Sequence, residues 1–392
     1  MNLTTIQAAL RQRGLDGWLF TDHHGRDPLA YRILGIPGGM CSRRWWYFVP
    51  AQGAPAGLAH KVEPRKLDTL PGKIEHYIAW TELHAKLRSI LSGSKRIAMQ
   101  YSPNNDIPYI GLVDAGTVEL IRACGPEVVT SADLVQQFEA VTGPEGFESH
   151  AWAGVIVQGI KDEAFAMMSD AVREGHHLTE FQVKEQIVRR FAEERLTCEG
   201  ESPIVGFNDH PADPHFEPTA ANAYALKRDD TVLLDLWARR DDPPGIYYDI
   251  TWCAYAGTVP PPKYVAIFDA ARRARDAAYQ FVHARLEAGT PTRGCDVDDV
   301  CRKVVRDAGY GEHFLHRTGH SIGVTVHGNG ANIDNLETKD ERLIVPGTCF
   351  SIEPGIYLAG SMAVRTEIDV FVTLKGRAEV IGAVQDELVL LA

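Results

Sequence analysis

Two aspartates interrupt neighbouring segments that otherwise have the composition of buried β-strands. Asp235 follows the apolar run Thr231-Val-Leu-Leu, and Asp249 stands inside Ile246-Tyr-Tyr-Asp-Ile-Thr-Trp. A buried carboxylate is costly unless a cation or hydrogen bonds compensate it. Because Pro243-Pro244-Gly245 separates the two segments, we expect a hairpin that brings both carboxylates side by side. For either aspartate taken alone, a solvated strand face is the alternative interpretation.

Two glutamates repeat this anomaly in the last fifty residues of the chain. Glu353 ends a short apolar strand, and Glu367 lies inside an apolar strand predicted over residues 364–373. Period-two alternation places Arg365 and Asp369 on the same face of that strand as Glu367. Acids in four apolar strands are difficult to explain as four separate solvated surfaces.

Four histidines lie close together in a segment that also contains glycines: His313, His316, His320 and His327. Imidazole is the commonest neutral metal ligand and the usual proton shuttle near neutral pH. Glycine lets the backbone approach a ligand closely. The cluster therefore favours a functional site, whereas a lone histidine would favour a structural role.

These residues together form a hard, oxygen-rich set of metal ligands: Asp235, Asp249, His320, Glu353 and Glu367. Such a set suits Mn²⁺, Co²⁺ or Zn²⁺ better than copper or an iron–sulfur cluster. Four negative charges exceed what one divalent ion neutralises, so we predict two ions that share a bridging hydroxide. That chemistry is typical of a metal-dependent hydrolase, with Mn²⁺ as the first candidate and Co²⁺ or Zn²⁺ as alternatives.

The composition limits the class of protein. The 392 residues are 45% hydrophobic, which is ample for a large core and suggests two domains or one large one. The net charge of −12 argues against nucleic acid or an anionic membrane as the main partner. Seven scattered cysteines without a Cys-x-x-Cys pair favour a reducing compartment. The N-terminus does not resemble a signal peptide, and no apolar run approaches the ~20 residues of a membrane span, so we expect a cytoplasmic protein.

The elements that must position these residues fall on either side of a predicted linker at residues 141–146. Alternating helices and strands before it predict an α/β domain, with strands at 18–20, 45–49, 96–99 and 118–121. After it we predict helices at 180–195, 263–287 and 297–308, and strands at 231–237, 246–256, 348–353 and 364–373. Arg272, Arg273 and Arg275 are predicted to lie on the solvated face of one of these helices.

The order Asp, Asp, Gly-His, Ile-Glu-Pro and Arg-x-Glu resembles the pita-bread metallopeptidases, which include methionine aminopeptidase, aminopeptidase P, prolidase and creatinase. Four segments look most like bacterial Xaa-Pro dipeptidases: residues 214–218, 249–252, 316–323 and 350–357. The resemblance implies an α/β (α+β) chain, with a creatinase/prolidase-type N-terminal domain over 1–140 and a pita-bread catalytic domain over 148–392.

The resemblance also implies the roles of the ligands. Asp235 would chelate one ion, Asp249 and Glu367 would bridge both ions, and His320 and Glu353 would complete the ligand shells. The glutamate that matches Glu353 also acts as the general base.

Further residues match positions around the substrate in the family. His327 would contact the substrate carbonyl and stabilise the oxyanion. His316 would line the proline pocket, and His215 would donate toward the leaving group. Arg365 would pair with Asp369 or Asp249, or receive the terminal carboxylate of the substrate. In the N-terminal domain the candidates are Asp27 for the substrate ammonium, and Arg43 and Arg44 for its carboxylate, with ordinary surface charges as the alternative.

The chain departs from the family pattern at two places. Trp252 stands where many prolidases carry arginine, and Gly328-Asn329-Gly330 replaces the usual Glu-x-Pro. We expect both places to border the substrate pocket and to affect substrate preference.

The resemblance implies hydrolysis of Xaa-Pro dipeptides. A bond to proline is a tertiary amide without an N–H, and a dinuclear site avoids the need for that hydrogen. The alternatives are an Xaa-Pro aminopeptidase that acts on longer peptides, a creatinase-like C–N hydrolase, and a binding module without activity. The complete ligand set argues against the last two. By analogy with dimeric relatives, we expect a homodimer. The expected substrate is a small peptide that contains proline.

Overall fold

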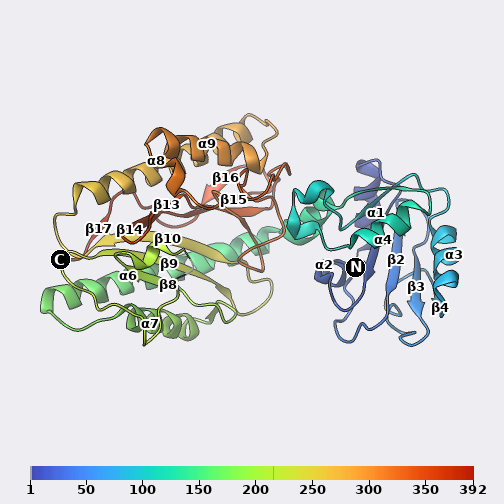
Figure 1. Ribbon diagram of the computed structural model, residues 1–392, viewed down its shortest axis with the longest axis horizontal. Coiled ribbons are helices and arrows are strands. Elements are labelled where there is room, and N and C mark those ends of the chain that lie inside the picture. The colour runs from blue at the N-terminus through green and yellow to red at the C-terminus, as the bar shows by residue number, and fades with distance from the viewer. Residues whose placement is uncertain (1, 215) are drawn as a thin grey trace. The chain divides into compact units, whose positions relative to one another are not determined.

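The computed structural model describes residues 2–214 and 216–392. The chain forms two compact units, Met1–Glu139 and Ala140–Ala392 (Figure 1). Among the described residues, no helix has the length and apolar character that crossing a membrane requires.

The N-terminal unit is built on one mixed six-stranded sheet in the order β4-β3-β2-β1-β5-β6. Its strands are β1 (Gly17–Asp22), β2 (Trp45–Pro50), β3 (Ala56–His60), β4 (Lys73–Tyr77), β5 (Arg96–Met99) and β6 (Glu127–Thr130). Its helices are α1 (Leu3–Gln12), α2 (Pro28–Leu34), α3 (Trp80–Ile90), α4 (Ala115–Arg122) and α5 (Ala132–Val135). Trp18 and Phe20 pack into one core and Leu19 into another, so side chains cover both faces of the sheet.

The strand predicted at 118–121 is wrong, because these residues lie in α4. Asp114 caps this helix by accepting a hydrogen bond from the backbone N–H of Thr117 at 2.9 Å. Val118 and Ile121 are both buried, and their spacing of three places them on one helical face. A short apolar run has no periodicity that distinguishes a strand from one buried helix turn.

The C-terminal unit places its strands between two pairs of helices (Figure 1). The helices are α6 (Pro144–Glu174), α7 (Glu180–Glu193), α8 (Pro262–Glu287) and α9 (Gly294–Asp307). One sheet contains β7 (Leu196–Thr197), β8 (Ile204–Phe207), β9 (Thr231–Arg240), β10 (Tyr248–Tyr255) and β17 (Val389–Leu390). A second sheet contains β11 (Ser321–Ile322), β12 (Cys349–Ile352), β15 (Ile368–Val372) and β16 (Ala378–Val380), and β13 (Gly355–Leu358) pairs with β14 (Met362–Arg365).

Short turns of helix occur in both units. The 3₁₀ turns lie at Pro103–Asn105, Pro108–Ile110, His210–Ala212 and Gly311–His313, and a π turn lies at Gln136–Ala140.

The predicted start of α7 is confirmed, whereas α6 begins at Pro144, inside the linker predicted at residues 141–146. Gly143 is the N-cap of α6 and Pro144 occupies its first turn, where the missing proline N–H costs nothing. Thr179 and Gln182 form a capping box at the start of α7, with reciprocal hydrogen bonds of 2.9 and 3.2 Å.

Alternation along β10 separates the two cores of this unit. Ile250 and Trp252 face the core that includes side chains of α6 and α7. Cys253 and Tyr255 face the core that includes side chains of α8 and α9. Since side chains alternate along a strand, Asp249 shares the second face, between the strands of the two sheets.

The single strand predicted over 364–373 is wrong, because the structure forms two strands there. β14 ends at Arg365 and pairs with β13, whereas β15 begins at Ile368 and pairs with β12 and β16. Between them the backbone N–H groups of Thr366 and Glu367 donate to Pro354 and Thr251 instead of to one common neighbour. These hydrogen bonds to distant residues interrupt the strand. A periodic pattern in the sequence cannot predict them, because it reports only which face a side chain takes.

Candidate metal centre

The two aspartates lie on one face of the β9–β10 pair. Asp235 stands opposite Thr251, and Asp249 stands opposite Trp237. The sequence predicted that the two carboxylates lie directly side by side. In the structure they are diagonal neighbours on the two strands. Both side chains are buried.

Thr251 connects this strand pair to the segment that carries Glu367. Its hydroxyl donates to Glu367 Oε2 at 2.7 Å and accepts a hydrogen bond from Arg365 Nε at 3.0 Å. Thr251 was not among the predicted site residues, although its place two residues after Asp249 puts it on the same strand face. The bond orients Glu367 toward the aspartates.

His320 is placed by a close contact between backbones. A Cβ at Gly319 would lie 1.9 Å from the Ser351 carbonyl oxygen, so only glycine fits there. The backbone N–H of His320 donates to Ser351 Oγ at 3.0 Å. Its ring Nδ1 lies 3.2 Å from the carbonyl oxygen of Ser321, which can only accept, so Nδ1 carries the proton of the neutral ring.

The unprotonated Nε2 of His320 therefore faces acidic groups. It lies 3.7 Å from Asp249 Oδ2 and 3.4 Å from Glu353 Oε1. Burial, with the neighbouring His327, lowers the pKa of His320 well below its ordinary value, which favours the neutral ring that binds metals.

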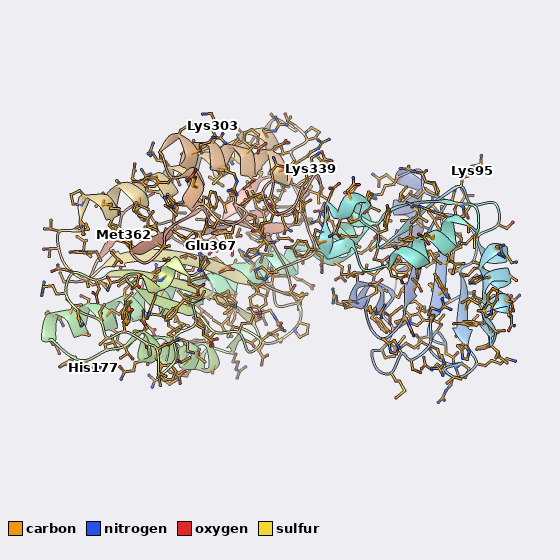
Figure 2. All side chains as sticks on the ribbon, viewed as in Figure 1. Lys95, His177, Lys303, Lys339, Met362 and Glu367 are labelled. Atoms are coloured by element: carbon orange, nitrogen blue, oxygen red, sulfur yellow. The ribbon has the colours of Figure 1, made fainter. Side chains whose placement is uncertain are left out.

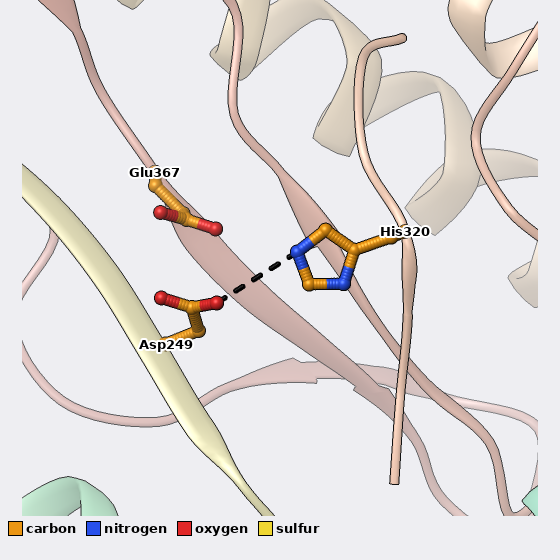
Figure 3. A group of neighbouring side chains, drawn as sticks. All are labelled: Asp249, His320 and Glu367. Carbon is orange, nitrogen blue, oxygen red and sulfur yellow. Dashed lines mark ion pairs between the residues drawn. The ribbon is translucent and has the colours of Figure 1, made fainter. Parts of the chain in front are cut away.

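Asp249, His320 and Glu367 offer ligand atoms that all lie within 4.8 Å of one another (Figure 3). They come from β10, from the segment before β11 and from the junction of β14 and β15. In Figure 2 Glu367 lies in the middle of the C-terminal unit, whereas Lys303 of α9 lies at its periphery. All three side chains are buried, so the trio is an interior site and not a patch of surface acids.

The chemistry of this donor set fits divalent cations. Three of the predicted ligands have a buried carboxylate oxygen without a hydrogen-bond partner within the described residues: Asp235 Oδ1, Asp249 Oδ1 and Glu367 Oε1. Burial first, and then the charge of nearby acids, raises the pKa of both Asp249 and Glu367 well above the ordinary range. A cation among these oxygens offsets both the cost of burying the carboxylates and the repulsion between their charges.

Arg365 has a different partner from the two that were predicted. Its Nη2 forms an ion pair with Asp235 Oδ2, and not with Asp369 or Asp249. Asp369 instead accepts a hydrogen bond from the backbone N–H of Asp249 at 2.7 Å and is itself buried. It is a further carboxylate behind the site, and period-two alternation from Glu367 had already placed it on that face.

His316 is held in one tautomer. Its Nδ1 lies 2.7 Å from the carbonyl oxygen of Arg317, so Nε2 accepts the hydrogen bond that Tyr357 donates at 2.7 Å. Arg365 Nη1 in turn donates to the Tyr357 hydroxyl oxygen at 3.1 Å. Burial, with the charge of Arg365, lowers the pKa of His316 to about 3, which keeps the ring neutral at pH 7. No sequence pattern identified Tyr357 as its partner.

The family model for "Metallopeptidase family M24" matches residues 156–374, which is more than half of the chain. The chain belongs to metallopeptidase family M24. Its two-unit α/β fold is shared with the crystal structure of dipeptidase PepE from Mycobacterium ulcerans, with a TM-score of 0.70 and 25% identity over 99% of this chain and 96% of that one. The predicted family and fold class are thereby confirmed.

Curated relatives of this M24 peptidase include dipeptidases. A "Probable dipeptidase PepE" of Mycobacterium tuberculosis (strain ATCC 25618 / H37Rv) is 27% identical over 96% of this chain and 93% of its own length. An "Xaa-Pro dipeptidase" of Lactobacillus helveticus is 32% identical over 60% of this chain and 58% of its own length. The family implies bound metal ions, which agrees with the donor set described above.

Of the two other histidines predicted around the M24 centre, His327 lies within the described residues. The His327 ring lies next to His320, with the ring centroids 4.5 Å apart. Its loop is held by Ser321, whose carbonyl oxygen accepts from the backbone N–H of Gly328 at 2.6 Å and whose hydroxyl accepts from that of Gly330 at 2.9 Å. These glycines therefore pack against Ser321. His215 lies outside the described residues.

The expectation that Trp252 borders the substrate pocket is wrong. Asp249 and Trp252 lie on opposite faces of β10, and Trp252 packs into the core with α6. Lys161 Nζ of that helix lies 3.6 Å from the centre of its ring. This departure from the family pattern thus concerns core packing.

The substrate-binding candidates of the N-terminal unit have mixed surroundings. Asp27 Oδ1 accepts a hydrogen bond from the backbone N–H of Ala30 at 2.9 Å and so caps α2. Asp27 and Arg44 line one cavity of about 540 Å³ in this unit, and Arg43 is exposed. Their role in substrate binding stays a prediction.

The Tyr357 hydroxyl offers a test of this network. Tyr357→Phe leaves two buried polar groups, on His316 and Arg365, without their bond, so we expect a loss of about 1–3 kcal/mol in the free energy of unfolding. Urea unfolding of the chelated protein measures it. Tyr279→Phe is the matched control, because the Tyr279 hydroxyl has no hydrogen bond among the described residues, and we expect a change within about 0.5 kcal/mol. Equal stability of both variants would contradict the network.

Proposed function

We propose that this M24 peptidase is a prolidase that hydrolyses Xaa-Pro dipeptides. Two divalent ions are held by Asp235, Asp249, His320, Glu353 and Glu367, with Mn²⁺ as the first candidate and Co²⁺ or Zn²⁺ as alternatives. The observation that carries the proposal is the convergence of Asp249, His320 and Glu367 ligand atoms within 4.8 Å in the buried interior. The Xaa-Pro dipeptidase relative supports the substrate class.

Glu353 is the proposed general base. When bound, the ions supply Lewis acidity toward water and toward the scissile carbonyl. In the metal-free protein burial, which Arg365 and Arg317 partly oppose, raises the pKa of Glu353 to about 7. The Glu353 carboxylate would accept a proton from water and later return it to the leaving amine.

Other side chains have proposed roles around the substrate. His327, next to His320, donates to the carbonyl oxygen as negative charge develops there. His316 is neutral and fixed by Tyr357, so it lines the proline side without adding charge. Arg365 holds Asp235 in place. His215 near the leaving group remains a proposal from the family pattern.

The remaining proposals concern the N-terminal substrate contacts, the domain bounds, the compartment and the oligomeric state. Asp27 binds the substrate ammonium, and Arg43 and Arg44 bind its carboxylate. Residues 1–140 form the creatinase/prolidase-type domain and residues 148–392 the catalytic domain. The protein is a cytoplasmic homodimer.

A peptide panel tests the substrate class. After chelation and re-addition of Mn²⁺, we expect cleavage of Gly-Pro-type dipeptides, and a loss of activity when the peptide amine is acetylated, because a dipeptidase recognises both termini. Liquid chromatography of the released amino acids measures the rates. Cleavage of Xaa-Pro-Xaa tripeptides alone would replace the proposal with an aminopeptidase.

A dipeptidase without a proline requirement is the second candidate. It is favoured by the PepE relative, which matches 96% of this chain and is named only as a dipeptidase. Equal kcat/KM for Gly-Pro and for a dipeptide with leucine at the second position would establish this candidate instead.

A further inference from the structure

Arg275 is the least expected charge in the C-terminal unit. It lies in α8 and is fully buried at 0% exposure, although the sequence placed it on a solvated helix face. The side chain of its neighbour Arg273 is 53% exposed, as predicted. A guanidinium is rarely buried without specific partners, so the contacts of Arg275 show what it does.

Arg275 reaches from the helix to the strands that carry the metal centre. Its Nη1 donates to Thr366 Oγ1 at 2.6 Å and to the backbone oxygen of Gln385 at 2.8 Å. Nε and Nη2 both donate to Asp276 Oδ1, at 2.9 and 2.7 Å, which balances the buried charge. The guanidinium is therefore fixed in one orientation.

Thr366 is the residue between Arg365 and Glu367. Both neighbours point toward Thr251 and the candidate metal centre, whereas Thr366 points back to Arg275. The Arg275–Thr366 bond thus holds the backbone of the β14–β15 junction from behind. No regular strand pairing holds this junction, because β14 has ended and β15 has not begun.

Gln385 fixes the neighbouring strand in the same way. Its Oε1 accepts from the backbone N–H of Cys253 at 2.9 Å, and its Nε2 donates to the Cys253 carbonyl oxygen at 2.6 Å. The Cys253 thiol in turn donates to the backbone oxygen of Arg365 at 3.2 Å. Strand β10 and the junction are thereby tied to each other and to α8.

We propose that Arg275, together with Gln385, is a positioning residue for the metal centre: it sets the place of Glu367 relative to Asp249. This inference rests on the proposed function. Groups that orient metal ligands typically change metal affinity or activity by about 10–100-fold when they are lost. Arg275 touches neither substrate nor ligand atoms, and it acts through the backbone of Thr366.

The Thr366 hydroxyl allows a test that leaves the buried charge in place. Thr366→Val removes the acceptor but keeps the shape, and Thr366→Ser keeps the acceptor. We expect Thr366→Val to weaken Mn²⁺ binding about 10-fold and Thr366→Ser to bind within about 2-fold of the wild type. Isothermal titration of the chelated full-length proteins with Mn²⁺ measures the affinity and the number of ions.

Arg275→Met completes a double-mutant cycle. If Arg275 acts through Thr366, the double variant should bind Mn²⁺ no more weakly than the worse single variant, whereas independent effects would add. Arg273→Gln is the control on the same helix, because among the described residues Arg273 pairs only with Asp269, on the exposed side. It should leave Mn²⁺ binding unchanged.

The outcomes separate two kinds of failure. Thr366→Val with wild-type Mn²⁺ affinity overturns the positioning role, as does equal weakening by Thr366→Val and Thr366→Ser. A wild-type protein that binds no Mn²⁺, Co²⁺ or Zn²⁺ overturns the proposed metal centre itself, and the positioning role falls with it.

Discussion

Replacing Glu353 by glutamine is expected to lower kcat for Xaa-Pro hydrolysis roughly 10³-fold, within the range typical of a lost general base. Glu353 Oε1 lies 3.4 Å from His320 Nε2 and accepts a hydrogen bond from Ser351 Oγ at 3.3 Å. Glutamine has nearly the same shape and keeps an oxygen for these contacts. It cannot accept a proton from water, and that difference should dominate the effect.

The measurement must separate the base from the ligand, because Glu353 is proposed to be both. Steady-state rates at saturating Mn²⁺ report the base, and calorimetric titration with Mn²⁺ reports the ligand. Glu341→Gln is the control, because Glu341 is half exposed and pairs with Lys339 at 3.0 Å. A Glu353→Gln enzyme that keeps kcat within 10-fold of the wild type would rule out the general-base role.

Removal of metal is expected to make the stability of the protein strongly dependent on pH. In the metal-free chain, burial raises the pKa of Glu353 from 4.5 to about 7 and those of Asp249, Glu367 and Asp369 well above their ordinary range. These carboxyl groups then bind more protons in the folded state than in the unfolded state. The lowered pKa values of His316 and His320 act in the opposite direction below their ordinary value of 6.5. The free energy of unfolding therefore falls most clearly as the pH rises through about 7, where both histidines are neutral in either state.

Bound cations should reverse this loss. A ligand present at 100 to 1,000 times its dissociation constant stabilises the fold by about 3–4 kcal/mol, or roughly 6–16 °C in Tm for a unit of this size. Because protons and Mn²⁺ compete for the same carboxylates, the gain in Tm from Mn²⁺ should grow between pH 5 and pH 8. Calorimetric scans of chelated and Mn²⁺-loaded protein give both curves.

The control for this prediction is the variant Asp249→Asn with Glu367→Gln. It removes two of the buried charges, so the metal-free variant should lose less stability between pH 5 and pH 8 and should gain little from Mn²⁺. A wild-type Tm that is insensitive to Mn²⁺ at pH 8 would show that these carboxylates bind no cation there.

Much of the local structure could be predicted because it depends on neighbours in the chain. The capping box of Thr179 depends on residues three positions apart, and the helical pattern of α8 and α9 likewise depends on residues three or four positions apart. The strand at 118–121 failed for the opposite reason. A buried helix turn and a buried strand present the same short apolar run.

The sequence by itself determined which side chains are candidates for the metal centre, since acids in apolar strands are costly without a cation. Only the tertiary structure decided how they meet. Arg365 pairs with Asp235, Thr251 orients Glu367, and the junction after β14 is held by Arg275. These contacts join residues about 90 to 130 positions apart. Periodicity along a strand fixes the face of a side chain, but the residue opposite that face depends on the packing of the whole unit.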